Sequence, residues 1–127
     1  MQMQRVFKTR QFARWARKVR LADDALCIAV AEMAKGLIDA DLGGGVVKKR
    51  VALPGRGKSA GTRALIATNK ADRWFFVFGF EKNERANIND KELETLQVAA
   101  NDLLKLGSDQ LDEAVLQEIL QEVCNDE

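Results

Sequence analysis

The stretch Trp74-Phe-Phe-Val-Phe-Gly-Phe-Glu-Lys82 decides the fold class, because it is almost entirely apolar up to its last two residues. It is much shorter than the roughly 18 apolar residues that a membrane-spanning helix needs. Its nearly unbroken apolar character predicts a central strand that is buried on both faces. Residues 62–69 and 46–53 predict two further strands, and short connections between them favour an antiparallel meander.

The strand predicted at residues 46–53 has two chemically different faces. Val47, Val51 and Leu53 share one face by alternation, and Lys48 and Arg50 share the other. We therefore expect one side of this strand to pack in the core and the other to present positive charge.

The segments that flank this strand are predicted to be loops. Residues 39–45 contain three consecutive glycines, and residues 54–61 carry Arg56 and Lys58 between Pro54 and Gly61. Gly55-Arg-Gly-Lys-Ser59 imitates the end of a nucleotide-binding P-loop, but Ala52 stands where the motif needs its first glycine, and a strand follows where it needs a helix. The loop can still contact phosphates through its cations.

Helical patterns occupy both ends of the chain. A strand at Gln4–Lys8 should precede a helix at Arg10–Val19, which Thr9 can cap, and a second helix at about Ala22–Lys35. After Lys82, a capping box at residues 89–92 predicts a helix to about residue 106, followed by an acidic helix from Ser108. The sequence thus predicts one α+β domain, residues 1–127, with a small, mostly antiparallel sheet and one or two C-terminal helices. The acidic helical extension would cover about residues 108–127.

Net charge is misleading for this chain. The 127 residues carry a formal charge of only +1, but residues 1–82 hold 17 Lys and Arg against seven Asp and Glu, and residues 83–127 hold three against 12. Residues 1–22 and 48–63 contain no acid. Such clusters are typical of surfaces that bind the phosphate backbone of nucleic acids, although they are also compatible with solvated faces that neutralise the acidic end.

Several site types find little support. The chain has no histidine and only two cysteines, Cys27 and Cys124, so a structural zinc site is not expected and neither is a disulfide framework. Cys27 is expected to be a buried apolar side chain. Asp39 and Asp41 lack a third carboxylate nearby, so no metal is expected there. The N-terminus lacks the apolar stretch of a signal peptide, which favours a cytoplasmic protein that does not contact the membrane.

The central part of the chain resembles the RelE/HigB branch of toxins from type II toxin–antitoxin systems. The resemblance covers about residues 4–106 and is carried by three segments: residues 42–59, Leu-Gly-Gly-Gly-Val-Val-Lys-Lys-Arg-Val-Ala-Leu-Pro-Gly-Arg-Gly-Lys-Ser; Gly61-Thr-Arg63; and Phe76-Val-Phe-Gly-Phe-Glu-Lys-Asn83. It implies a ribosome-associated endoribonuclease that cuts mRNA without a metal or cofactor. It also implies a cognate antitoxin as partner, besides the ribosome and mRNA; a homodimer is possible.

The resemblance places a catalytic role on three cations. Arg63 would bind the scissile phosphate, and Lys82, or else Lys48, would act as the base, because neighbouring cations favour the neutral form of a lysine. The implied RNA- and phosphate-binding residues are Lys49, Arg50, Arg56, Lys58 and Phe80, the last as a stacking face.

One departure of this chain from the residue pattern of the family favours a different function. Many ribonucleases of this superfamily use a tyrosine or histidine, and this chain contains neither. The general acid is therefore unassigned. The alternative is a non-catalytic protein on the same fold that inhibits a protein target such as DNA gyrase, or that binds nucleic acid without cutting it.

Overall fold

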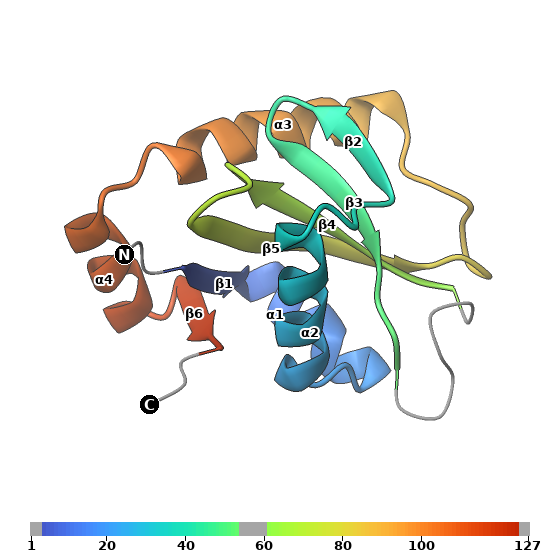
Figure 1. Ribbon diagram of the computed structural model, residues 1–127, viewed down its shortest axis with the longest axis horizontal. Helices are drawn as coiled ribbons and strands as arrows, with labels where there is room; N and C mark the ends of the chain where they lie inside the picture. The colour runs from blue at the N-terminus through green and yellow to red at the C-terminus, as the bar shows by residue number, and fades with distance from the viewer. Residues whose placement is uncertain (1–3, 54–60, 125–127) are drawn as a thin grey trace.

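The computed structural model describes residues 4–53 and 61–124, which form four helices and a six-stranded sheet (Figure 1). The strands are β1 (Arg5–Thr9), β2 (Ala40–Gly43), β3 (Val46–Arg50), β4 (Thr62–Thr68), β5 (Arg73–Glu81) and β6 (Leu120–Val123). The helices are α1 (Arg10–Val19), α2 (Asp23–Ala34), α3 (Asp90–Leu104) and α4 (Ser108–Leu116). The α+β class is confirmed.

The sheet is mostly antiparallel, as predicted, and its strand order is β2-β3-β4-β5-β1-β6. Strands β3, β4 and β5 form the predicted meander. Strand β1 pairs with β5 in parallel. The helix pair that follows β1 carries the chain to β2 at the far edge of the sheet, and the meander then returns to β1. The apolar stretch therefore lies in the interior of the sheet, with Trp74, Phe75 and Phe76 fully buried.

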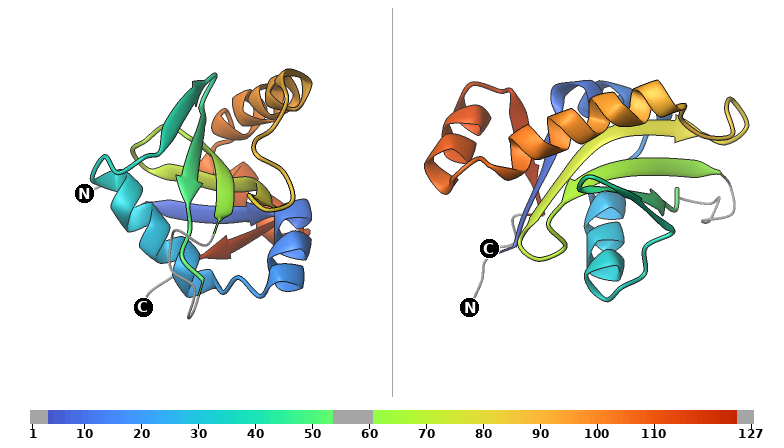
Figure 2. Two further views of the ribbon diagram at one scale, coloured as in Figure 1. Left: turned by 90° about the vertical axis from the view of Figure 1, so that its right-hand side faces the viewer. Right: turned by 90° about the horizontal axis from the view of Figure 1, so that it is seen from above.

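Helices cover both faces of the sheet (Figure 2). The predicted helix pair, α1 and α2, packs through Phe12, Leu26 and Val30 on the face that carries Val47 and Phe76. Helices α3 and α4 pack on the opposite face, where the core contains Phe7, Val46, Leu65, Ala100 and Leu111. None of the helices in the described ranges is long and apolar enough to cross a bilayer.

Local capping signals fix two helix starts as the sequence predicted. The Thr9 hydroxyl accepts a hydrogen bond from the Phe12 N–H (3.2 Å) at the start of α1. At α3, Asn89 accepts from the Glu92 N–H (2.8 Å) while Glu92 accepts from the Asn89 N–H (2.9 Å). These reciprocal bonds satisfy helix-end donors that have no partner within the helix.

The prediction of a loop at residues 39–45 is wrong. Strand β2 pairs antiparallel with β3, and Gly43 lies opposite Val46, which leaves a two-residue turn at Gly44 and Gly45. Both turn residues have positive φ (62° and 84°), a combination that type I′ hairpin turns require and glycine adopts without strain. Only two of the three glycines therefore belong to the turn itself.

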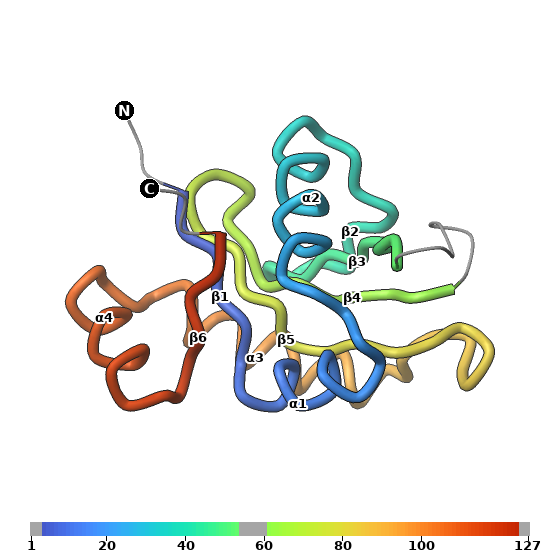
Figure 3. Tube along the Cα trace, turned by 90° about the horizontal axis from the view of Figure 1, so that it is seen from below, coloured from blue at the N-terminus to red at the C-terminus, as the bar shows by residue number. Residues whose placement is uncertain are grey.

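The prediction of a helix throughout residues 108–127 is also wrong. Helix α4 ends at Leu116, Glu118 adopts a left-handed conformation (φ 62°), and residues 120–123 form β6. Strand β6 lies antiparallel beside β1 and covers what would otherwise be an open edge (Figure 3). Leu120 and Val123 are buried by this pairing, whereas Ile119 is exposed.

The cysteines also differ from the expectation. Cys27 of α2 and Cys124, just after β6, form a disulfide with their Cα atoms 5.6 Å apart, so Cys27 is not a free apolar side chain. The two residues are 97 positions apart in the sequence. Only the docking of β6 against β1 brings them together, and their spacing carries no sign of it.

Candidate functional site

Three neighbouring strands place candidate residues in one row across the sheet. Arg50 of β3 is the register partner of Arg63 of β4, which is in turn the partner of Phe80 of β5. Lys48 lies two residues before Arg50 and pairs with Leu65. Directly opposite residues project to the same face, so Lys48, Arg50, Arg63 and Phe80 share the face that α3 covers further along.

The cations of this row differ in how they are neutralised. Arg50 is exposed, and its Nε donates to Asp39 Oδ1 at 2.9 Å. Arg63 is half-buried, and its closest polar contact within residues 4–53 and 61–124 is a weak hydrogen bond to the Thr62 carbonyl (3.5 Å). Lys48 is half-buried and forms no ion pair with any described residue. Two neighbouring cations are thus available to bind an anion.

Lys82 extends the same site beyond the end of β5. Its N–H donates to the Gly61 carbonyl at 2.7 Å, which continues the β4–β5 ladder by one step, and its side chain is exposed. Gly61 has a φ of 103°, and a Cβ placed on it would lie 3.2 Å from the Lys82 Cβ. Glycine therefore lets the chain enter β4 beside Lys82. Arg56 and Lys58 lie outside the described residues.

Lys49 is placed away from the other candidates. It projects to the α2 face, is only 4% exposed, and its ammonium contacts Glu32 Oε1 at 3.0 Å and the Leu37 carbonyl at 2.8 Å. A lysine that is buried and paired in this way ties β3 to α2. This geometry gives Lys49 a structural role and does not support the predicted phosphate contact.

Arg85 is a site residue that the sequence analysis missed. Its guanidinium lies 5.9 Å from the ring centroid of Phe78 and 6.0 Å from the ring centroid of Phe80. The same guanidinium forms a bidentate ion pair with Glu92. This ion pair raises the pKa of Arg85 and lowers that of Glu92. Arg85 thereby fixes the connection after β5 over the sheet. Phe80 is only 3% exposed, so it lies mainly in the packed interior.

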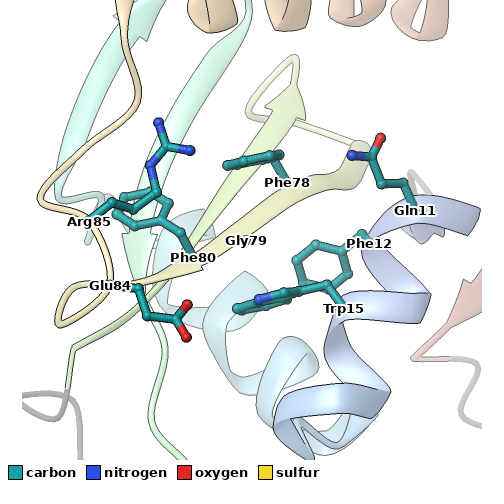
Figure 4. A pocket seen from close by; sticks show the side chains of 8 residues that line it. All are labelled: Gln11, Phe12, Trp15, Phe78, Gly79, Phe80, Glu84 and Arg85. Atoms are coloured by element: carbon teal, nitrogen blue, oxygen red, sulfur yellow. The ribbon is translucent and has the colours of Figure 1, made fainter.

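A cavity of about 250 Å³ opens beside β5, next to this row (Figure 4). Phe12 and Trp15 of α1 form one wall, and Phe78, Gly79 and Phe80 form another. Gly79 is required for the close approach of the two walls, because a Cβ there would lie 2.1 Å from the Trp15 ring.

The acidic C-terminal part neutralises only some of the basic residues. Arg5 donates to Glu122 and Asp112, both at 2.8 Å, and these bonds raise its pKa. Helix α1 and its C-cap differ: the side chains of the four exposed cations Arg14, Arg17, Lys18 and Arg20 form no hydrogen bond or ion pair with any residue that the structure describes. A positive surface therefore remains on α1 as well as around Arg63.

The carboxylates that were considered for a metal are engaged elsewhere. Asp39 binds Arg50, and Asp41 binds Lys70, an ion pair that lowers the pKa of the Asp41 carboxyl. The described segments contain no cluster of three or more Cys, Asp or Glu side chains able to hold a metal ion.

Comparisons with known proteins agree with this arrangement. A comparison with protein families matches residues 4–123 to the family described as the RelE toxin of the RelE / RelB toxin–antitoxin system. No curated protein matches the chain. The family match spans every strand and helix of the structure, including α4 and β6, which lie beyond the segments that carry the sequence resemblance. The chain therefore belongs to the RelE toxin family, as a toxin of a toxin–antitoxin system, and this membership implies an antitoxin partner.

Proposed function

We propose that this toxin is a ribosome-associated, metal-independent mRNA endonuclease. The observation that carries the proposal is the pair of Lys48 and Arg63, which lie on one face of adjacent strands without a carboxylate partner among the described residues. Guanidinium and ammonium groups bind phosphate strongly when no competing acid holds them. The exposed cations of α1 add attraction for phosphates that does not depend on sequence.

The chemistry requires few groups from the protein, because RNA carries its own nucleophile. The ribose 2′-hydroxyl attacks the neighbouring phosphorus, a cyclic phosphate forms, and the 5′ oxygen of the next nucleotide leaves. Arg63 would hold the scissile phosphate in line and stabilise its developing negative charge. Lys82 would accept the 2′-hydroxyl proton, with Lys48 as the second candidate, and Arg50 would contact the flanking backbone.

The test is to map cuts in mRNA with ribosomes present. Wild-type protein should cut within the ribosomal decoding site, and Arg63→Ala should reduce the cutting rate by about 100-fold or more, because it removes the group that stabilises the transition-state charge. Lys105→Ala is the matched control, since it removes an exposed cation just after α3. It should leave cutting unchanged, and both variants should keep the wild-type melting temperature.

The absence of tyrosine and histidine supports a second candidate function, a non-catalytic inhibitor of a protein target. If cells that express the toxin stop growing while their transcripts stay intact, the endonuclease proposal is wrong and this candidate replaces it. Purification of the bound target from the same cells would then identify it.

A further inference from the structure

The cavity beside β5 has no role in the proposed cleavage chemistry, although it shares Phe80 with the candidate site (Figure 4). It exists because β1 pairs with β5 only as far as Phe76. Beyond that residue the chain turns into α1, so the described structure pairs the outer half of β5 with β4 alone. Aromatic rings and a strand edge with free backbone polar groups thus border the same space.

The walls of the cavity offer both stacking and polar groups. The Trp15 indole lies against Gly79 across from Phe78, and Arg85 stacks over Phe78 and Phe80. The exposed Glu84 carboxylate is directed toward Trp15 in Figure 4. Aromatic surfaces with a few polar groups at the rim are typical of sites that take a planar ring.

Two exposed cations belong to the elements that border this aromatic space, although neither lines the cavity itself. Lys18 follows Trp15 by three positions in α1, so it lies on the same side of the helix, and it is exposed without a described partner. Lys82 is exposed at the end of β5. An aromatic slot flanked by unneutralised cations is the arrangement with which proteins hold single-stranded nucleic acid, the rings stacking on bases and the cations binding phosphates.

We propose that this cavity binds one unstacked nucleobase of the RNA substrate, with guanine preferred; the inference rests on the proposed function for its choice of RNA. Guanine suits the site because its Watson–Crick edge presents two adjacent N–H donors, which the two oxygens of the Glu84 carboxylate can accept together. Uracil presents a single N–H donor. The base would stack on Trp15 while the neighbouring phosphates lie toward Lys18 and Lys82.

Tryptophan fluorescence gives a direct readout. The chain has two tryptophans, and Trp74 is fully buried, whereas Trp15 is half-buried and lines the cavity. Short 2′-O-methyl oligoribonucleotides are suitable probes, because the blocked 2′ oxygen prevents cleavage. We expect an oligonucleotide with one guanine to quench the fluorescence and to bind about tenfold tighter than the same chain with an abasic position there, as base–aromatic stacking predicts.

Three variants separate the contribution of stacking on Trp15 from that of hydrogen bonding to Glu84. Trp15→Phe should abolish the quenching while the chain still folds, Glu84→Gln should remove the preference for guanine over uracil, and Glu94→Gln should change neither. Glu94 is the matched control because it is an exposed glutamate on α3, outside the cavity. Melting temperatures should confirm that each variant is folded.

Two results would overturn the proposal. One is equal affinity for the guanine and abasic oligonucleotides, which would leave only backbone attraction. The other is quenching by the purified antitoxin but by no oligonucleotide, which would make the cavity a protein-binding site. The base site and the cleavage proposal can fail separately: Arg63→Ala should stop cutting and leave the quenching intact, and quenching without any cutting by wild type would refute the cleavage proposal alone.

Discussion

Replacement of Lys49 by methionine tests whether two adjacent lysines of β3 have different roles. Lys49→Met keeps most of the side-chain volume but removes an ammonium that is held between Glu32 and the Leu37 carbonyl. Hydrogen bonds to charged groups contribute about 1.5–3 kcal/mol each, and loss of one partner from a buried pair costs about 3–5 kcal/mol. The Glu32 side chain is 25% exposed and can regain water, so we expect a loss of about 2 kcal/mol.

The matched control is Lys48→Met, one position earlier on the opposite face. Lys48 is half-buried without an ion pair to a described residue, so its replacement should change the free energy of unfolding by less than about 0.5 kcal/mol. Urea unfolding measures both values, and the Lys49→Met loss should appear as a fall of roughly 6–10 °C in melting temperature. In the mRNA cleavage assay the order should reverse, with Lys48→Met showing the larger defect.

A double-mutant cycle makes the test quantitative. The pair Lys49→Met and Glu32→Gln should show a coupling energy of about 1–2 kcal/mol, because the two residues contact each other directly. Equal stability losses for Lys48→Met and Lys49→Met would refute the assignment of these residues to opposite faces. So would a cleavage defect in Lys49→Met without any loss of stability.

Three further predictions concern the disulfide, the wall of the cavity and pH. Reduction of the bond between Cys27 and Cys124 should lower the free energy of unfolding by about 4–5 kcal/mol, since it opens a loop of 97 positions; urea unfolding with and without a thiol reductant measures this, and an unchanged midpoint would contradict it. Gly79→Ala should cost about 1–3 kcal/mol and shift the emission of Trp15, because the new methyl group overlaps its ring; unchanged emission and stability would show that the contact is absent. The lowered pKa of Glu92 means that its charged form stabilises the folded state above its ordinary pKa of 4.5 and that this contribution disappears as the pH falls through the lowered value. Stability of Glu92→Gln should therefore differ from wild type at neutral pH and converge with it in acid, and a constant difference would refute the linkage.

The two charge blocks of the sequence are only partly separated in space. The acidic C-terminal segment folds back on β1, where Glu122 and Asp112 bind Arg5. The cations of α1 and the pair of Lys48 and Arg63 have no acidic partner in the ranges that the structure describes. Steep weakening of ribosome binding with salt is therefore expected, because each phosphate contact releases counterions.

Local signals were sufficient for most of the fold. The apolar stretch of β5, the alternation in β3, the cap at Thr9 and the capping box at Asn89 each act within a few residues, and each is confirmed. The grouping of Lys48, Arg50 and Arg63 on one face was also predictable, because alternation along neighbouring strands of a meander depends on short connections. These features are determined by the sequence itself.

Tertiary structure decided what depends on contacts between distant segments. Residues 120–123 continue an apolar pattern compatible with a helix, and only the unpaired edge of β1 makes them a strand. The same docking joins Cys27 to Cys124. Lys49 belongs to a cationic stretch that is typical of phosphate binding, but its ion pair with Glu32 makes it part of the core. The sequence by itself determined which residues can form strands, helices and a cationic face; the tertiary structure decided which of these cations are neutralised, because the partners lie far away along the chain.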